Sequence, residues 1–396
     1  MIKRTILPLL TLFFLTSGLS ASQKIVTFDQ SFSGRAGKRM EIERAGGKVV
    51  KDLWLINAVA AVFPDGTKDS GIYSSRNVTM VEDDVYQNWL LSNTPSFDGA
   101  PLPGVDEMIG DLAENWTDRS LPRPEPAKSL TPWGVEKVNA PAVWAGNQGE
   151  GVKVAIVDTG VDYEHRDLKP NYKGGYNAAN PSAKPLDDNG HGTHVAGIVG
   201  ALNDSVGVVG VAPKAELYSV KVLNADGSSS YSTIIDGIQW CVENKIQVMN
   251  ISLGGRSGTP AFQKALKNAV KAGITVICAA GNDKSSVNYP AKYPETIAVS
   301  AGTADDKLAY FSSRGPEIGF IAPGVDIRST YMGNEYRTLD GTSAAAPHVT
   351  GLAALAIRAG NDTPEKVKAS LIGAARDLGL DPAFQGHGLI DAAKIK

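Results

Sequence analysis

The sequence predicts an α/β protein with a mainly parallel sheet covered by helices on both faces, preceded by a smaller α+β unit. From residue 131 onward, apolar segments alternate with helical ones, as in VKVAIVD, ELYSVKVL, IQVMNISL, ITVICAA and TIAVSA against STIIDGIQWCVEN and AFQKALKNAVKA. The apolar segments are nearly continuous in Val, Ile, Leu and Ala, as strands are when both faces of a sheet are buried. Ligand sites in such folds lie at the carboxyl ends of the strands.

The smaller unit covers residues 24–87. Its alternating apolar runs indicate strands, and Gly46 with Gly47 ends its main helix. The predicted elements are a strand at 24–28, a helix at 36–45, strand runs at 48–63 and 78–86, and a short helical or turn segment at 69–76.

Between residues 92 and 128 the composition shifts to Pro, Asp, Ser and Gly, which predicts a linker between the two units. A short helix is expected within it at 107–114.

Composition excludes several classes of protein. The 396 residues are 42% hydrophobic and 20% charged, which is typical of a soluble globular chain. The net charge of −3 provides no basic surface for a phosphate backbone, so nucleic acid is not expected as a partner.

The first 21 residues are typical of a secretory signal peptide. Lys3 and Arg4 precede an apolar run at 6–15, and Ser20 and Ala21 are the small residues typical of a signal-peptide cleavage site. A membrane anchor is the alternative, but that run is shorter than the roughly 20 residues needed to cross a bilayer. We therefore expect export, either to the extracellular space or to a periplasm, with no membrane association after signal removal.

Only two cysteines occur, Cys241 and Cys278, so no disulfide framework is predicted. Both lie in apolar contexts, which favours buried free thiols, and a single bridge remains open.

Three motifs carry the chemistry. Asp158 ends the strand VAIVD, His191 opens a helix in NGHGTHVAG, and Ser343 begins another in LDGTSAAAPHV. A serine hydroxyl needs an imidazole to take its proton and a carboxylate to orient that imidazole. These residue types therefore predict nucleophilic catalysis of acyl transfer.

The order Asp, His, Ser and these three motifs resemble the subtilases, and the resemblance extends over nearly the whole chain. It implies a subtilisin-like three-layer α/β/α fold with a ferredoxin-like propeptide domain. The implied divisions are a signal peptide at 1–21, a propeptide at 22–91, a linker at 92–128 and a catalytic domain at 129–396.

The same resemblance implies a secreted, monomeric serine endopeptidase with Asp158, His191 and Ser343 as its triad. It works through an acyl-enzyme with broad specificity and favours hydrophobic residues at P1, the substrate residue before the cleaved bond. The propeptide is expected to assist folding, to be cut by the enzyme itself at about 89–92, and to remain as an inhibitor.

The resemblance also assigns the residues that hold the substrate. Asn282 and the Ser343 N–H form the oxyanion hole. Extended substrate would pair with exposed strand edges. The residues implied are Gly227, Ser228 and Ser229 on one side, Ser252, Leu253 and Gly254 on the other, Ala279, Ala280 and Gly281 around the P1 pocket, Asn288 at its floor, and Tyr231 with Ile234 around a more distant apolar pocket.

Asp187 and Asp188 precede His191, near the second substrate position. They either favour basic substrate residues or form a solvated acidic loop.

The segment ALNDSVGVVGVAP resembles the family's calcium loop. Oxygen-only ligation suits calcium. The implied structural site takes side-chain oxygens from Asp167 and Asp204 and main-chain carbonyls from Leu202, Val206 and Val208.

Three alternative functions fit the sequence less well. Zinc binding by His191 and His194 lacks an HExxH glutamate and an obvious third ligand. A lipase-like esterase needs a GxSxG elbow with the serine first, whereas Ser343 lies in GTSAA and comes last. A non-catalytic binding protein is disfavoured because every expected catalytic residue is present.

Overall fold

The computed structural model describes residues 21–90 and 131–396. The expected signal segment up to residue 20, the expected linker at 92–128 and the helix expected at 107–114 lie outside the described residues.

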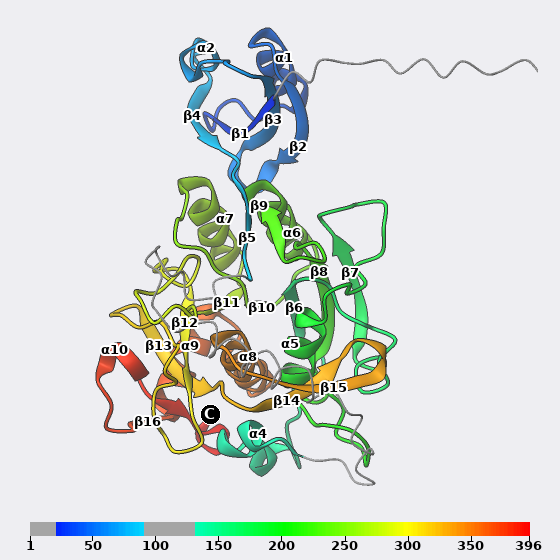
Figure 1. Cartoon of the computed structure of the whole chain (residues 1–396), viewed down its shortest axis with the longest axis vertical. Helices are drawn as coiled ribbons and strands as arrows, with labels where there is room; N and C mark the ends of the chain where they lie inside the picture. Colours follow the sequence, from blue (N-terminus) through cyan, green and yellow to red (C-terminus); the bar gives the residue numbers. More distant parts are fainter. Residues whose placement is uncertain (1–20, 91–130) are drawn as a thin grey trace, which may run out of the picture.

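The N-terminal domain is a four-stranded antiparallel sheet in the order β2-β3-β1-β4 (Figure 1). Its elements are β1 Ala21–Phe28, α1 Arg35–Arg44, β2 Lys48–Leu53, β3 Ala58–Pro64, α2 Asp69–Ile72 and β4 Val78–Asp83. The run predicted as one strand at 48–63 forms two, because a 3-10 turn at Trp54–Ile56 and the left-handed Asn57 (φ 55°) reverse the chain.

Both faces of this small sheet are buried. On one face Val26, Phe28 and Phe63 pack with Ile42 of α1. On the other, Ile25 and neighbouring alanines belong to the core of the large domain. Successive apolar residues of β1 therefore pack into two different cores, one on each face of the small sheet.

The large domain is built on a seven-stranded sheet in the order β13-β12-β11-β10-β6-β8-β7, and every neighbouring pair is parallel. The strands are β6 Lys153–Asp158, β7 Tyr172–Asn177, β8 Glu216–Lys221, β10 Val248–Ile251, β11 Thr275–Ala279, β12 Ile297–Gly302 and β13 Ile318–Pro323. This confirms the predicted sheet. The sequence analysis did not identify β7 (YKGGYN) or β13 (IGFIAP), in which glycine interrupts the apolar run.

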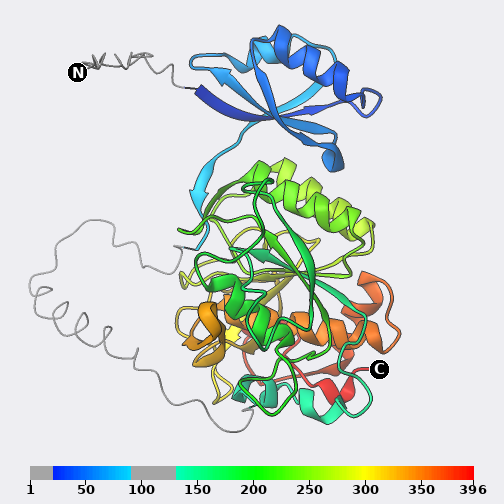
Figure 2. The ribbon, with the colours of Figure 1, turned by 90° about the vertical axis from the view of Figure 1, so that its right-hand side faces the viewer.

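Helices cover the two faces of the sheet and make three layers (Figures 1 and 2). Along β6, Val154 and Ile156 pack with α5 His191–Gly200 and α8 Thr342–Arg358. The intervening Ala155 and Val157 pack with α6 Tyr231–Glu243 and α7 Pro260–Lys271 on the opposite face. The alternation of side chains along a strand thus explains why the strands are apolar throughout.

Shorter elements complete the domain. They are β5 Tyr86–Asn88, α4 Trp133–Lys137, the 3-10 turn Ala140–Val143, β9 Ser228–Ser230, the hairpin β14 Ile327–Tyr331 and β15 Glu335–Leu339 with the 3-10 turn Met332–Asn334 between them, α9 Pro364–Ala374, β16 Ala375–Arg376, α10 Pro382–Gln385, β17 Leu389–Ile390 and the 3-10 turn Ala392–Lys394. No helix within residues 21–90 or 131–396 is long and apolar enough to cross a membrane.

The small domain sits over α6 and α7 (Figures 1 and 2), and its carboxylates lie at the N-termini of both helices. Asp84 Oδ1 accepts from Ser232 N in α6 at 2.9 Å, and Glu82 Oε1 accepts from Ala261 N in α7 at 3.2 Å. Anions are stabilised at helix N-termini, where main-chain N–H groups lack partners. In both contacts a side-chain carboxylate of the small domain accepts a hydrogen bond from a main-chain N–H group of the large domain.

The two cysteines are buried, and both are free thiols. Burial raises the pKa of each thiol, so both stay protonated. The single bridge that the sequence left open does not form.

Candidate active site

Asp158 and His191 are hydrogen-bonded at the carboxyl end of the central strand. Asp158 is the last residue of β6 and fully buried, and its Oδ1 accepts from Thr159 N at 2.7 Å. His191 is the first residue of α5, and its Nδ1 lies 2.8 Å from the same oxygen. The carboxylate therefore holds Nδ1 as the protonated nitrogen and leaves Nε2 to accept a proton.

Ser343 lies in the first turn of α8, which packs against α5. Its Oγ donates to Ser252 O at 3.2 Å, and Ser252 Oγ donates to Ser343 O at 3.0 Å. Among the described residues Ser343 Oγ makes no hydrogen bond to His191. Rotation about the Ser343 Cα–Cβ bond would release the hydroxyl from Ser252, and a catalytic hydrogen bond that is absent without substrate can form when substrate binds.

His191, whose side chain is partly exposed, has a different electrostatic environment from the buried histidines His194 and His348. Burial lowers its pKa, but the charge and hydrogen bond of Asp158, with the charge of Asp187, outweigh burial and raise the pKa overall. Burial lowers the pKa of His194 to about 3 and that of His348 to about 4. His194 Nε2 instead faces the carbonyls of Ile327 and Arg337, at 3.0 and 3.2 Å.

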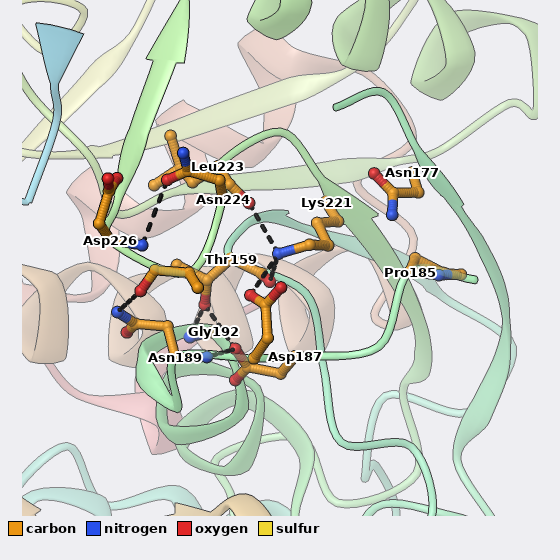
Figure 3. Close-up of polar contacts among 12 residues, drawn as sticks. Thr159, Asn177, Pro185, Asp187, Asn189, Gly192, Lys221, Leu223, Asn224 and Asp226 are labelled. Atoms are coloured by element: carbon orange, nitrogen blue, oxygen red, sulfur yellow. Dashed lines mark hydrogen bonds and ion pairs between the residues drawn. The ribbon is translucent and has the colours of Figure 1, made fainter. Parts of the chain in front are cut away.

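Asp187 is a second buried carboxylate near the start of α5, and Figure 3 shows it next to Thr159 and Gly192. Its Oδ1 accepts from Thr159 Oγ1 at 2.8 Å and from the main chain of Asn189 and Gly190, both at 3.0 Å. Its Oδ2 accepts from Thr193 N at 2.9 Å and Thr193 Oγ1 at 2.5 Å. Asp187 therefore organises the N-terminus of the helix that carries His191.

Lys221 joins three loops around the site (Figure 3). Its buried ammonium donates to Thr159 O and Asp188 Oδ1, both at 2.6 Å, and to Leu223 O at 2.8 Å. The ammonium of Lys221 thus partly neutralises the charge of Asp188, while both carboxylate oxygens of Asp187 already accept hydrogen bonds. Asp187 is buried and therefore not part of a solvated acidic loop, whereas Asp188 is exposed and forms an ion pair with Lys221.

Two N–H donors converge beside Ser343. Asn282 Oδ1 accepts from Thr342 N and Thr342 Oγ1, both at 2.8 Å, which fixes the amide. A Cβ added to Gly341 would lie 3.3 Å from Asn282 Nδ2 and 3.5 Å from Ser343 N. Both donors therefore lie within 3.5 Å of one point at the start of α8.

The predicted cleft walls lie on either side of this point. A small, open pocket is lined by Leu253, Gly254, Ala279, Gly281, Asn282, Thr342 and Ser343, together with Trp89 and Leu90 of the small domain. Gly227, Ser228 and Ser229 form the opposite edge with β9, while Ala280 is buried behind the wall. Asn288 is buried next to Gly254 and Gly281.

The end of the small domain runs along these walls as an added strand. β5 pairs antiparallel with β9, with Gln87 opposite Ser229. Trp89 N donates to Gly227 O at 2.9 Å, and Gly254 N donates to Trp89 O at 3.2 Å. The Trp89 main chain therefore bridges the two edges of the cleft, as an extended peptide would.

The Trp89 side chain fills the more distant apolar pocket. It is 1% exposed, and its ring meets Tyr231 edge-on with centroids 5.1 Å apart and Phe262 at 6.1 Å. Ile234 and Leu253 belong to the same core. Tyr231, Ile234 and Leu253 thus lie in one core around the Trp89 ring, and Phe262, which the sequence analysis missed, joins them from α7.

The predicted calcium ligands also lie close together. Leu202 N donates to Asp167 O at 3.0 Å, and Val208 N donates to Asp167 Oδ2 at 3.1 Å. Asp204 Oδ1 accepts from Val206 N at 2.8 Å. The Leu202 and Val206 carbonyls accept no main-chain hydrogen bond from the described residues. Such an oxygen-only donor set fits a hard cation.

Sequence reasoning missed the roles of Asp187, Thr159 and Lys221. Each makes its contacts with residues distant in the chain, so no local spacing reveals them. An available signal was the position of Asp187 four residues before His191, where a carboxylate can accept from the first N–H groups of a helix.

Comparison with known proteins shows that the segment containing this site matches a known protein family. The model described as "Subtilase family" matches residues 149–388, which include Asp158, His191, Asn282 and Ser343. Subtilisin E from Bacillus subtilis (strain 168) is 39% identical over 387 residues, covering 95% of this chain and 91% of that protein.

Two further relatives match mainly the large domain. Subtilisin from Bacillus pumilus is 46% identical over 268 residues, 66% of this chain and 96% of that protein. The thermostable alkaline protease of Halalkalibacterium halodurans is 43% identical over 266 residues, 66% of this chain and 73% of that protein.

Proposed function

The chain belongs to the subtilase family and is a serine endopeptidase, and on this premise we propose that Asp158, His191 and Ser343 are its catalytic triad. The observation that carries the assignment is the 2.8 Å hydrogen bond between His191 Nδ1 and Asp158 Oδ1, on a helix that packs against the helix whose first turn holds Ser343.

The proposed reaction proceeds through an acyl-enzyme. Ser343 Oγ attacks the substrate carbonyl carbon while His191 Nε2 takes the hydroxyl proton. The tetrahedral intermediate collapses, the C–N bond breaks, and the imidazolium returns the proton to the leaving amine. Water then attacks the ester by the same route and frees Ser343.

Asn282 and the N–H of Ser343 would stabilise the negative oxygen of the intermediate. Their convergence near Gly341 supports this role, since preorganised donors act most strongly where charge develops. The Asn282 amide needs no reorientation, because Thr342 already holds its oxygen.

The test is the Ser343→Ala precursor, compared with the unmodified precursor by intact mass and by casein hydrolysis. Self-cleavage and hydrolysis in the unmodified precursor, both lost in the variant, are expected. Casein hydrolysis that persists in Ser343→Ala would contradict the triad.

We also infer a secreted precursor with a signal peptide at 1–21, a propeptide at 22–91, a linker at 92–128 and a monomeric catalytic domain at 129–396. The strand pairing of β5 with β9 supports an inhibitory propeptide, because it covers the cleft that substrate needs. N-terminal sequencing of the secreted form tests these boundaries, and a cut at about 89–92 is expected first.

The proposed substrates are polypeptides with hydrophobic P1 residues. Leu253 and Ala279 line the pocket with aliphatic surface, and main-chain pairing along the cleft favours extended peptides over small esters. Peptide anilides that vary only at P1 measure this preference.

A structural calcium ion is proposed at Asp167, Leu202, Asp204, Val206 and Val208. The supporting observation is the gathering of two carboxylates and the Leu202 and Val206 carbonyls around one loop. The ion would hold the loop after α5, and no catalytic step passes through it.

A further inference from the structure

Helix α8 begins with the proposed nucleophile but cannot satisfy the carbonyl of that residue in the usual way. In an α-helix each carbonyl accepts a hydrogen bond from the N–H group four residues later. The residue four positions after Ser343 is Pro347, which lies inside α8, and proline has no N–H group. The carbonyl of Ser343 therefore needs a donor from outside this pattern.

Ser252, the residue after β10, supplies that donor. Its Oγ donates to Ser343 O at 3.0 Å, and its carbonyl accepts from Ser343 Oγ at 3.2 Å. Ser252 is completely buried. One buried serine therefore holds the nucleophile twice, through the main chain of Ser343 and through its side chain.

Two further buried side chains orient the Ser252 hydroxyl. Asn250 Nδ2 donates to Ser252 Oγ at 2.8 Å, and Thr350 Oγ1 donates to Asn250 Oδ1, also at 2.8 Å. Asn250 and Thr350 are both completely buried. Asn250 belongs to β10 and Thr350 to α8, about two turns after Ser343. The network therefore leaves α8, crosses to β10 and returns to the first turn of the same helix.

All three hydrogen bonds of this network run in one direction. The Thr350 hydroxyl donates to the amide oxygen of Asn250, the amide nitrogen donates to Ser252, and the Ser252 hydroxyl donates to Ser343 O. Because Ser252 Oγ accepts from the amide, its own proton is directed at Ser343 O. Hydrogen bonds in series strengthen one another in a low-dielectric interior. Thr350 therefore acts on Ser343 through Asn250 and Ser252.

We propose that Asn250 and Thr350 are positioning residues for the hydrolytic reaction. With Ser252 they form a buried network that supplies the donor missing at Pro347 and fixes the first turn of α8 at Ser343. The placement of a nucleophile matters, because a displacement of about 1 Å can slow a reaction about 100-fold. The proposal deepens the proposed function and rests on it, since Ser343 must be the nucleophile.

The network completes the support of Ser343 that begins with Asn282. Asn282 Oδ1 holds Thr342 N and Thr342 Oγ1 just before the nucleophile, and Ser252 holds the carbonyl of the nucleophile itself. Rotation about the Ser343 Cα–Cβ bond can then redirect the hydroxyl while the Ser343 N–H keeps its place as an oxyanion donor. Loss of the network should therefore slow the attack and leave substrate pairing along the cleft edges unchanged.

The experiment measures kcat and KM of the mature enzyme for one peptide p-nitroanilide, and the rate of inactivation by phenylmethylsulfonyl fluoride. The inhibitor reports attack by Ser343 without substrate pairing along the cleft. The variants are Ser252→Ala, which removes the donor to Ser343 O, Thr350→Val, which keeps the shape and removes the hydroxyl, and Thr350→Ser, which keeps the hydroxyl. Ser300→Ala is the control, because Ser300 is completely buried and its hydroxyl donates to a different carbonyl, Phe384 O, at 2.5 Å.

We expect kcat to fall about 10-fold in Ser252→Ala and about 5-fold in Thr350→Val, the effect of roughly one hydrogen bond, with KM within about twofold of wild type. Inactivation by the sulfonyl fluoride should slow by similar factors. Thr350→Ser should recover kcat, and Ser300→Ala should leave kcat and KM unchanged.

Thr350→Val decides the proposal, because Thr350 is buried and is not one of the residues that line the pocket beside Ser343. A kcat and an inactivation rate within about twofold of wild type in this variant would overturn the proposal, and so would an equal loss of kcat in Ser300→Ala or a change confined to KM. Thermal unfolding of each variant separates these effects from a loss of folded enzyme. Failure of the proposed function is distinguishable, since hydrolysis would then survive Ser343→Ala.

Discussion

His191 lies between two buried carboxylates with different tasks. Asp158 takes the Nδ1 hydrogen bond at 2.8 Å, whereas Asp187 contacts the helix around the histidine and acts on it through charge. Both negative charges stabilise the protonated imidazole, and they raise the pKa of His191 against the opposing effect of burial. A general base must be deprotonated, so this balance sets the acidic limit of activity.

We predict that Asp187→Asn moves the acidic limb of the kcat/KM profile to lower pH. Neutralising Asp187 removes a charge that favours the imidazolium, so the pKa of His191 falls and the active neutral form persists to lower pH. The maximum rate should also fall, because the N-terminus of α5 loses its carboxylate. The measurement is kcat/KM against pH, with circular dichroism to confirm folding.

Asp188→Asn is the matched control for this prediction. Asp188 is paired with Lys221 and does not contribute to the pKa of His191. An equal shift in both variants would mean that general surface charge, rather than Asp187, controls the base.

The helices α6 and α7 connect the small domain to the cleft. Both begin beneath β4 and β5, where Asp84 and Glu82 accept from their first N–H groups. Helix α6 also begins directly after β9, the strand that receives β5. The same helix start therefore anchors the small domain and positions one edge of the cleft.

We predict that Asp84→Asn weakens inhibition by the small domain. Loss of the charge at the α6 N-terminus should cost about 1 to 2 kcal/mol, or roughly tenfold in affinity. The lag between self-cleavage and full activity should shorten, as measured by progress curves of peptide hydrolysis.

Asp65→Asn serves as the control, because Asp65 is an exposed turn residue of the small domain. A lag in Asp84→Asn that matches the lag in Asp65→Asn would show that the helix-end contact does not hold the domain.

At the scale of the whole molecule, the loop at 202–208 joins the end of α5 to the start of the segment leading into β8. Asp167 ties this loop to the region before β7 through its main chain and its carboxylate. A bound cation would therefore stabilise the native state of the whole large domain, because it binds that arrangement and not the unfolded chain.

Removal of calcium should lower the unfolding temperature of the Ser343→Ala protein, which cannot digest itself. At a free calcium concentration of about 100 times Kd the stabilisation is about 2.7 kcal/mol, equivalent to roughly 5 to 10 °C. Thermal unfolding with calcium and with EGTA measures this difference. Asp167→Ala should abolish the difference, and an unchanged calcium response in that variant would place the ion elsewhere.

The sequence by itself determined the layered fold and the types of residue available for catalysis. Continuous Val, Ile and Leu runs such as β6 can be stable only when both faces of the sheet are covered, so the pattern predicts the helices on each side. The glycines of β7 and the chain reversal at Asn57 could not be predicted as strand boundaries. The alternation of apolar residues is a weak signal where glycine or a left-handed residue gives the backbone more freedom. The three motifs likewise placed Asp158, His191 and Ser343 at element ends.

Only the tertiary structure decided what surrounds those residues. It placed Asp187 and Lys221 around the His191 helix, Trp89 across the cleft, and the Asn250 amide between Ser252 and Thr350. Hydrogen bonding and burial depend on distances between groups far apart in the chain, such as Lys221 and Thr159 or Trp89 and Gly254. Those distances exist only after the sheet has brought the loops at its carboxyl edge together.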